Sequence, residues 1–149
     1  LQGIDISISK SEYKNHVIYF KSKKAESKAP LNEELYAYLK QYYNDIKIVA
    51  VEPAESPVMS GGEAGLHGIQ GIGDGSKFLV DLKKVDDIMV ISTEDAKSRM
   101  KQLIGTGLLV GISSGANVLA SERWIEQNNP DGVVVTILCD RGERYLSCM

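Results

Sequence analysis

The sequence predicts an α/β fold with an open, mostly parallel sheet and flanking helices. Short apolar runs rich in β-branched residues alternate with segments in which apolar residues recur every three or four positions. The first pattern is typical of strands covered on both faces, and the second of helices that lie against a sheet. The chain of 149 residues is long enough to bury one hydrophobic core. The predicted strands are residues 46–52, 87–92, 108–112 and 133–139.

Residues 1–29 carry weaker signals than the rest of the chain. They contain six lysines and three acidic residues, and they show no helical periodicity. Residues 16–20, HVIYF, could form a short buried strand, whereas the lysine-rich stretch after them is typical of a loop. We therefore divide the chain into a poorly defined segment, 1–29, and an α/β domain, 30–149. We expect the first segment to be poorly ordered or packed as an edge.

The first predicted helix follows Pro30. Glu33 and Glu34 stand in its first turn, where the helix dipole favours negative charge. Its apolar face comprises Leu31, Leu35, Tyr38, Leu39 and Tyr42. The strand 46–52 comes next, and it leads into the stretch VEPAESPVMSGGEAGLHGIQGIG, residues 51–73, which contains six glycines and a single histidine.

Two further helices are predicted in the second half of the chain. One begins after the strand 87–92, where Ser92 and Asp95 stand at the spacing of a capping box. Its apolar face comprises Ala96, Met100 and Leu103. The other begins at the stretch SSGAN, directly after residues 108–112. It presents Ala116, Leu119, Ala120 and Trp124 on one face.

Composition excludes several classes of protein. A net charge of −3 with scattered acidic residues disfavours a nucleic-acid binder, which would present a basic face. No apolar run reaches the roughly 20 residues that a membrane-spanning helix needs. Cys139 and Cys148 are too few for a disulfide framework and do not have the spacing of a metal site. We therefore expect reduced thiols, no bound metal, and a cytoplasmic location.

Three junctions between a predicted strand and a loop are candidate ligand sites: the residues after Glu52, residues 111–115 and residues 139–142. Parallel α/β sheets bind ligands at the carboxyl ends of their strands. The sequence GISSG at 111–115 would direct free N–H groups and hydroxyls to one point, although a plain serine N-cap is the commoner meaning of such a start. The stretch GIQGIGDG lacks the third glycine of a dinucleotide-binding loop. His16 and His67 are more typical of hydrogen-bonding residues than of catalysts.

Four segments together resemble one family. IKIVAVEPAESPVMSGG, GLHGIQGIGDG, GLLVGISSGAN and CDRGERYLS are similar, in order and spacing, to the carboxy-terminal half of cysteine synthase, also called O-acetylserine sulfhydrylase. That family belongs to the tryptophan-synthase-β-like enzymes that use pyridoxal phosphate. The resemblance covers about residues 35–148, and it implies the carboxy-terminal domain of a fold type II enzyme.

The resemblance implies a reaction and a set of site residues. The reaction is a β-replacement in which sulfide displaces the acetate of O-acetylserine and gives L-cysteine. The glycine-rich segment would line the entrance of the active-site cleft and move as substrate binds, with Gly71, Ile72 and Gly73 as the wall nearest the cofactor. Ser113 would meet the pyridine nitrogen of pyridoxal phosphate, and Asp140 would lie beside it. The acyl donor, acetylserine or phosphoserine, stays open, as does a cystathionine synthase-like activity.

Several family features have no counterpart in this sequence. The lysine that binds the cofactor, the loop that binds the substrate carboxylate and the glycine-rich phosphate loop are missing, and Glu33 and Glu34 stand near the expected phosphate position. The chain also begins at Leu1 and not at methionine, which suggests a fragment, a processed product or an incomplete gene description. We therefore assign no catalytic residue and expect weak or absent cofactor binding.

Two interpretations follow. The chain is the carboxy-terminal part of a cysteine synthase, or it is a non-catalytic remnant. Such a remnant could form a homodimer or bind the carboxy-terminal tail of serine acetyltransferase.

Overall fold

A four-stranded parallel sheet forms the centre of the molecule. The computed structural model describes residues 16–20, 31–73, 75 and 80–148. Its strands are β1 (His16–Phe20), β2 (Lys47–Pro53), β3 (Asp87–Ile91) and β4 (Val133–Val135). Their order in the sheet is β3-β2-β1-β4, and every neighbouring pair is parallel. The predicted fold class, an open parallel α/β sheet, is therefore confirmed.

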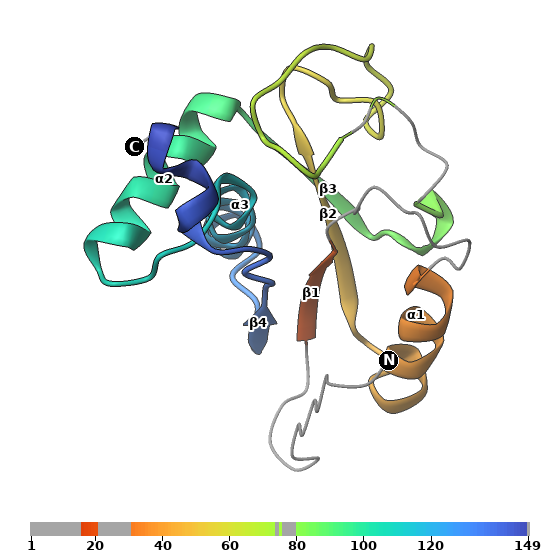
Figure 1. The fold of residues 1–149 in the computed structure, drawn as a ribbon. Coiled ribbons are helices and arrows are strands. Elements are labelled where there is room, and N and C mark those ends of the chain that lie inside the picture. Colours follow the sequence, from red (N-terminus) through yellow and green to blue (C-terminus); the bar gives the residue numbers. More distant parts are fainter. Residues whose placement is uncertain (1–15, 21–30, 74, 76–79, 149) are drawn as a thin grey trace.

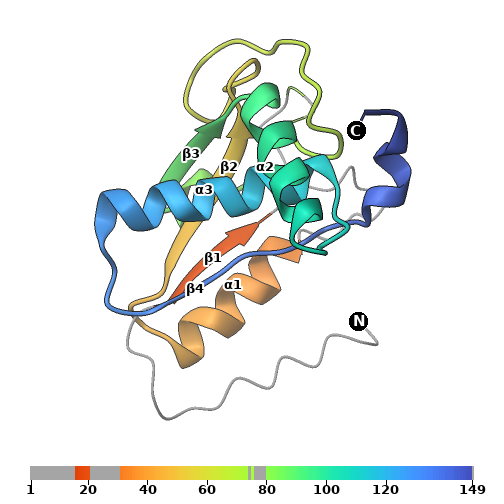
Figure 2. The same cartoon turned by 90° about the vertical axis from the view of Figure 1, so that its left-hand side faces the viewer.

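Helices cover both faces of this sheet. The α-helices are α1 (Leu31–Tyr42), α2 (Thr93–Gly105) and α3 (Ile112–Asn128), and two 3₁₀ helices are η1 (Leu82–Lys84) and η2 (Gly142–Cys148). Helix α1 lies on one side, whereas α2 and α3 lie together on the other (Figure 1). The loop that follows β2 lies beyond the carboxyl ends of β2 and β3 (Figure 2).

The buried positions of the strands and helices coincide with the apolar residues from which these elements were predicted. Residues 48–53 of β2 are all buried, as expected for an interior strand covered on both faces. Strand β3 lies at an edge, and only Met89 and Ile91 are buried there, at alternate positions. In α2 the apolar face is buried as predicted, and the Ser92 hydroxyl accepts a hydrogen bond from the Asp95 N–H at 3.1 Å.

Helices α2 and α3 pack closely against each other. Ala116, Ala120 and Trp124 of α3 are buried, and Leu119 is partly buried against them. A Cβ added at Gly115 would lie 2.3 Å from the Ala96 carbonyl oxygen, so the two backbones meet at this glycine. The packing of α2 on α3 therefore fixes where α3 begins beside the sheet.

Two of the four predicted strands differ from the structure. Residues 108–112 form no strand: Val110 makes one antiparallel bridge to Arg141, and Ile112 already belongs to α3. An apolar run that ends in the first turn of a helix resembles a strand in sequence, which explains the error. The run at 133–139 pairs only as far as Val135, where its register with β1 ends.

Strand β1 corrects the expectation for residues 16–20. They form a strand as suggested, but it lies between β2 and β4, so the expectation of an edge is wrong for these residues. A five-residue apolar run does not reveal whether it is paired on one side or on two. The rest of residues 1–29 lies outside the described residues, and the division at residue 29 stays a prediction.

Helix α1 is confirmed, with one exception in its predicted face. Leu39 is buried, whereas Tyr42 is 45% exposed at the last helical residue. Leu31, Leu35 and Tyr38 have side chains outside the described part of the structure.

Candidate functional site

The loop after β2 begins with a buried carboxylate. Glu52 is only 2% exposed, and it accepts hydrogen bonds from the Met59 N–H at 2.7 Å and the Ser60 N–H at 2.9 Å, and from the Ser60 hydroxyl. A buried carboxylate is costly unless such donors surround it. Glu52 therefore holds the first part of the loop against the end of its own strand.

A second set of hydrogen bonds ties the loop to helix α2. Glu55 accepts a hydrogen bond from the Thr93 N–H at 2.8 Å, and the Thr93 hydroxyl accepts one from the Gly68 N–H at 2.9 Å. Burial opposes ionisation of Glu55, but the hydrogen bonds, chiefly that from the Thr93 N–H, leave the pKa of its carboxyl below the usual value. The amino end of α2 also favours a negative charge at this position.

The glycine-rich part of the loop ends in a tight turn. Gly71 has φ +85° and Gly73 has φ +61°, values that other residues rarely adopt. A Cβ at Gly73 would lie 2.7 Å from Cδ of Pro53. His67 contacts the carbonyl oxygen of Gly73 through Nε2 and accepts a hydrogen bond from the Ile69 N–H at Nδ1, at 3.3 Å.

The opposite wall comes from the end of the segment that follows β4 and from η2. The Tyr145 hydroxyl donates to Oδ2 of Asp140 at 2.6 Å, while Oδ1 of Asp140 is buried and has no hydrogen-bond partner among the described residues. Burial, followed by the Asp140 carboxylate, raises the pKa of Tyr145 to about 12. The Gly111 N–H donates to the Asp140 carbonyl oxygen at 3.1 Å, which joins this wall to the start of α3.

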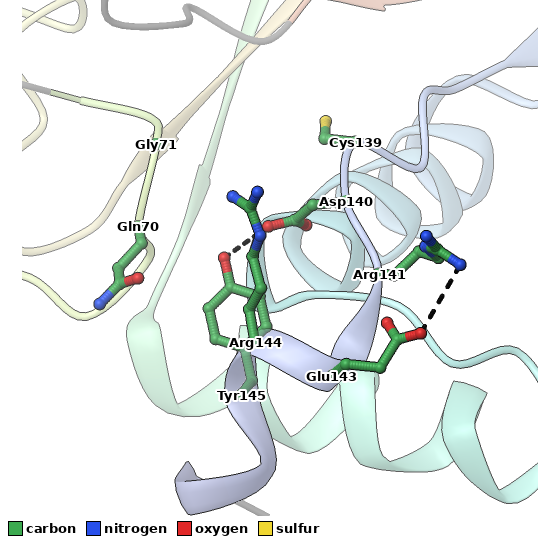
Figure 3. Close-up of a pocket in the computed structure, with 8 residues that line it drawn as sticks. All are labelled: Gln70, Gly71, Cys139, Asp140, Arg141, Glu143, Arg144 and Tyr145. Atoms are coloured by element: carbon green, nitrogen blue, oxygen red, sulfur yellow. Dashed lines mark hydrogen bonds and ion pairs between the residues drawn. The ribbon is translucent and has the colours of Figure 1, made fainter.

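These two walls border an open cavity of about 790 Å³. Its volume lies within the range of roughly 300–1,000 Å³ that small-molecule sites occupy. Asp140, Arg144 and Tyr145 face Gln70 across the gap, whereas Arg141 is drawn toward Glu143, with which it pairs at 3.7 Å (Figure 3). The lining residues are Gln70, Gly71, Cys139, Asp140, Arg141, Glu143, Arg144 and Tyr145.

The cavity brings together some of the predicted site residues and not others. Gly71 and Asp140 line it, although they are distant in sequence. Ser113 is fully buried in the first turn of α3, Ile72 is 5% exposed and belongs to the hydrophobic core, and Gly73 packs on Pro53. The roles of all five predicted residues stay predictions.

The start of α3 also differs from the simplest sequence interpretation. The N-cap residue is Gly111, so neither serine is an N-cap. The Ser114 hydroxyl instead accepts a hydrogen bond from the Cys139 N–H at 3.0 Å. The serines therefore lie inside the helix, and one of them joins it to the 139–145 segment.

Sequence reasoning missed Tyr145 and Gln70 as lining residues. Tyr145 follows Asp140 by five positions in the CDRGERYLS stretch, so the resemblance pointed to the segment and not to this side chain. Gln70 precedes Gly71 and had no chemical signal of its own. Among the residues that the structure describes, no helix is long and apolar enough to span a membrane, and no group of acidic, cysteine and histidine side chains could hold a metal ion.

Comparisons with known proteins agree on one family. The family described as pyridoxal-phosphate dependent enzyme matches residues 35–140. Cysteine synthase B of Campylobacter jejuni is 45% identical over 112 residues, and a probable cysteine synthase of Bacillus subtilis is 42% identical over 111; each match covers 73% of this chain and 36% of the relative. The crystal structure of O-acetyl serine sulfhydrylase isoform 3 from Entamoeba histolytica is 37% identical, with a TM-score of 0.77 over 91% of this chain and 40% of that one. The chain thus spans little more than a third of the length of these curated relatives.

Proposed function

Because this chain belongs to the pyridoxal-phosphate dependent enzyme family, we propose that it is the carboxy-terminal part of a cysteine synthase. The complete enzyme forms L-cysteine from O-acetylserine and sulfide by β-replacement. One observation carries the proposal: Gly71 of the glycine-rich loop and Asp140 of the CDRGERYLS segment line one cavity. Both residues lie within 35–140, the part of the chain that the family matches.

The described residues fit one side of the cofactor. The cavity of about 790 Å³ is roomy enough for a small planar ring, and the Asp140 side chain lies in its wall. Gly71 has φ +85° and no side chain, so it presents bare backbone at the cavity wall. Gly71 would form the wall beside the ring, backed by Ile72 in the core and by Gly73 against Pro53, with Asp140 opposite.

Ser113 is proposed as the partner of the ring nitrogen. Its side chain is fully buried here, so this role requires the start of α3 to open toward the cavity. A serine hydroxyl at this position would give the nitrogen a neutral hydrogen bond worth about 1 kcal/mol.

The chain's own residues bind and orient, and none of them is assigned a proton transfer. Pyridoxal phosphate, when bound, supplies the electron sink for the β-replacement. The pKa of Tyr145 is about 12, so its hydroxyl keeps its proton at neutral pH. This hydroxyl donates a hydrogen bond to Oδ2 of Asp140 at 2.6 Å. This contact holds the Asp140 carboxylate in one orientation at the cavity wall. The lysine and the phosphate loop would come from the rest of the enzyme, so we expect the isolated chain to be inactive.

Exposed leucines favour the second candidate, a dimerisation or tail-binding module without catalysis. Leu108, Leu109 and Leu146 are 47%, 41% and 65% exposed. Leu109 lies against the start of η2, because the Gly142 N–H donates to its carbonyl oxygen at 3.1 Å. Exposed apolar side chains of this kind suit a second copy of the chain or a peptide tail such as that of serine acetyltransferase. Light scattering of the chain, alone and with the tail peptide, tests this candidate.

A chimera tests the proposed function. Residues 35–140 of this chain replace the matching segment of the Campylobacter jejuni cysteine synthase B, and cysteine formation from O-acetylserine and sulfide is measured. We expect an active chimera that binds pyridoxal phosphate, because the missing lysine and phosphate loop are restored. A chimera that folds and binds the cofactor but forms no cysteine would count against the proposal.

The isolated chain is the matched control for that chimera. Treatment with pyridoxal phosphate and borohydride, followed by peptide mapping, should label several lysines weakly, and the cysteine-forming assay should give no turnover. A single stoichiometrically labelled lysine accompanied by turnover would contradict the expected inactivity of the chain.

A further inference from the structure

His67 joins two points of the glycine-rich turn through its two ring nitrogens. Nδ1 accepts from the Ile69 N–H at 3.3 Å, and Nε2 contacts the carbonyl oxygen of Gly73. A backbone N–H can only donate, so Nδ1 must carry no proton. A carbonyl oxygen can only accept, so Nε2 must carry one. Both contacts therefore hold together only in the neutral imidazole with its proton on Nε2.

The contacts of His67 hold a turn whose other side is held by the core. Ile69 is fully buried and Ile72 is 5% exposed, and both belong to the hydrophobic core. Between these anchors stand Gln70 and Gly71, which line the cavity. The core fixes how deep the turn lies, while the two bonds of His67 fix how it closes from residue 69 to residue 73.

Charged groups from two elements lie near residues 67 and 68. Glu55, in the loop after β2, lies within electrostatic range of His67. Lys97, on α2, lies beside the next residue, with Nζ 3.6 Å from the position of a Cβ added at Gly68. The Gly68 N–H donates to Thr93 at 2.9 Å, so the residue next to His67 is tied to α2. This hydrogen bond holds the backbone next to His67 in place.

We propose that His67 is a positioning residue for the cleft wall at Gln70 and Gly71. In the neutral form with a proton on Nε2, it holds the 69–73 turn in the shape that closes one side of the cavity. Loss of either ring nitrogen releases one end of the turn and leaves the hydrophobic core in place. The importance of this wall for ligand binding rests on the proposed function, whereas the hydrogen-bond geometry does not.

Nuclear magnetic resonance of the chain labelled with ¹⁵N-histidine tests the protonation state directly. The chain has two histidines, and the variant His67→Gln identifies which signals belong to His67. At neutral pH we expect the pattern of a ring with a proton on Nε2 and a bare Nδ1. A ring protonated at Nδ1, whether neutral or charged, would overturn the proposal, and this measurement needs neither cofactor nor activity.

Three variants test the positioning role by amide hydrogen exchange. His67→Phe removes both contacts, His67→Asn keeps an acceptor near the place of Nδ1, and His67→Gln keeps a donor near the place of Nε2. A hydrogen bond worth about 1 kcal/mol corresponds to about fivefold in exchange rate, so Phe should accelerate exchange at Ile69 by about fivefold or more. His67→Phe should also accelerate exchange in the residues around Gly73. His67→Asn should restore protection from exchange at Ile69, and His67→Gln should restore it around Gly73.

The control amides are Val49 in β2 and Met100 in α2, which are buried far from the turn in sequence. Exchange at these amides should not change in any variant. Unchanged exchange at Ile69 in His67→Phe, or acceleration equal to that at Val49 and Met100, would overturn the positioning role. An inactive chimera with the expected tautomer and exchange pattern would reject the proposed function alone.

Discussion

Replacement of Gly115 by alanine should separate helices α2 and α3. The added Cβ would lie 2.3 Å from the Ala96 carbonyl oxygen, 2.7 Å from the Met100 nitrogen and 3.1 Å from its Cα. All three atoms are backbone, so no side chain can rotate away, and α2 must move as a body. Overpacking of this kind costs roughly 1–3 kcal/mol, and more where backbone must shift. A glycine-to-alanine change inside a helix otherwise stabilises it by about 1 kcal/mol.

The net expectation for Gly115→Ala is a loss of about 1–2 kcal/mol in the free energy of unfolding, measured by urea denaturation with circular dichroism. Gly105→Ala is the matched control, because nothing in the described part of the chain lies within 4 Å of a Cβ at that position. It should be neutral or stabilising by up to about 1 kcal/mol, from helix propensity alone. Equal stability of the two variants would refute the close backbone contact between α2 and α3.

Three further changes test the site. Tyr145→Phe should lower the free energy of unfolding by about 1–3 kcal/mol, because the buried Asp140 carboxylate loses its donor; a double-mutant cycle with Asp140→Asn that shows no coupling would contradict this. The pKa of Tyr145 is raised from 10.0 to about 12, so between these pH values the native protein retains a proton that the unfolded chain releases. The free energy of unfolding should therefore fall between about pH 10 and 12 in the wild type, and less so in Tyr145→Phe. Denaturant unfolding at increasing pH measures this difference. The pKa of Glu55 is lower in the native protein than in the unfolded chain, so its ionised carboxylate stabilises the fold above the unfolded pKa, and this stability is lost as the pH falls through the native pKa. The stability of Glu55→Gln should therefore depend less on acidic pH than that of the wild type. An unchanged loss of stability at acidic pH would argue against the hydrogen bond of Glu55 to α2. Ser114→Ala leaves the Cys139 N–H without its acceptor and should cost about 1–2 kcal/mol in denaturant unfolding, whereas a neutral result would mean that water replaces the hydroxyl.

The elements predicted best from the sequence are those with a simple burial pattern, either continuous along a strand or confined to one face of a helix. Strand β2 is buried at six successive residues, and α2 has a capping serine and a single apolar face. Residues 108–112 were misassigned because a short apolar run looks the same in a strand and in a connection that enters a buried helix. The place of β1 inside the sheet depends on pairing with residues far along the chain, which no local pattern carries.

The candidate site could be predicted by segment better than by side chain. Resemblance pointed to the glycine-rich loop and to the CDRGERYLS stretch, and residues of both line the cavity. It did not reveal that Ile72 turns into the core or that Ser113 is fully buried. Whether a side chain in a turn faces a cavity or the core depends on backbone angles such as φ +85° at Gly71, which sequence spacing alone does not determine.

The interior position of β1 has a consequence for the order in which the sheet can assemble. Its residues pair with β2, which follows α1, but they also pair with β4, where His16 meets Val133 far later in the sequence. One edge of β1 therefore stays unpaired until the much later segment Val133–Val135 is available. Closing so long a loop costs entropy before any contact is gained, so β4 should join β1 late. Until then, one edge of β1 is open to any other strand, which makes this edge the point where newly made copies are most exposed to pairing with one another.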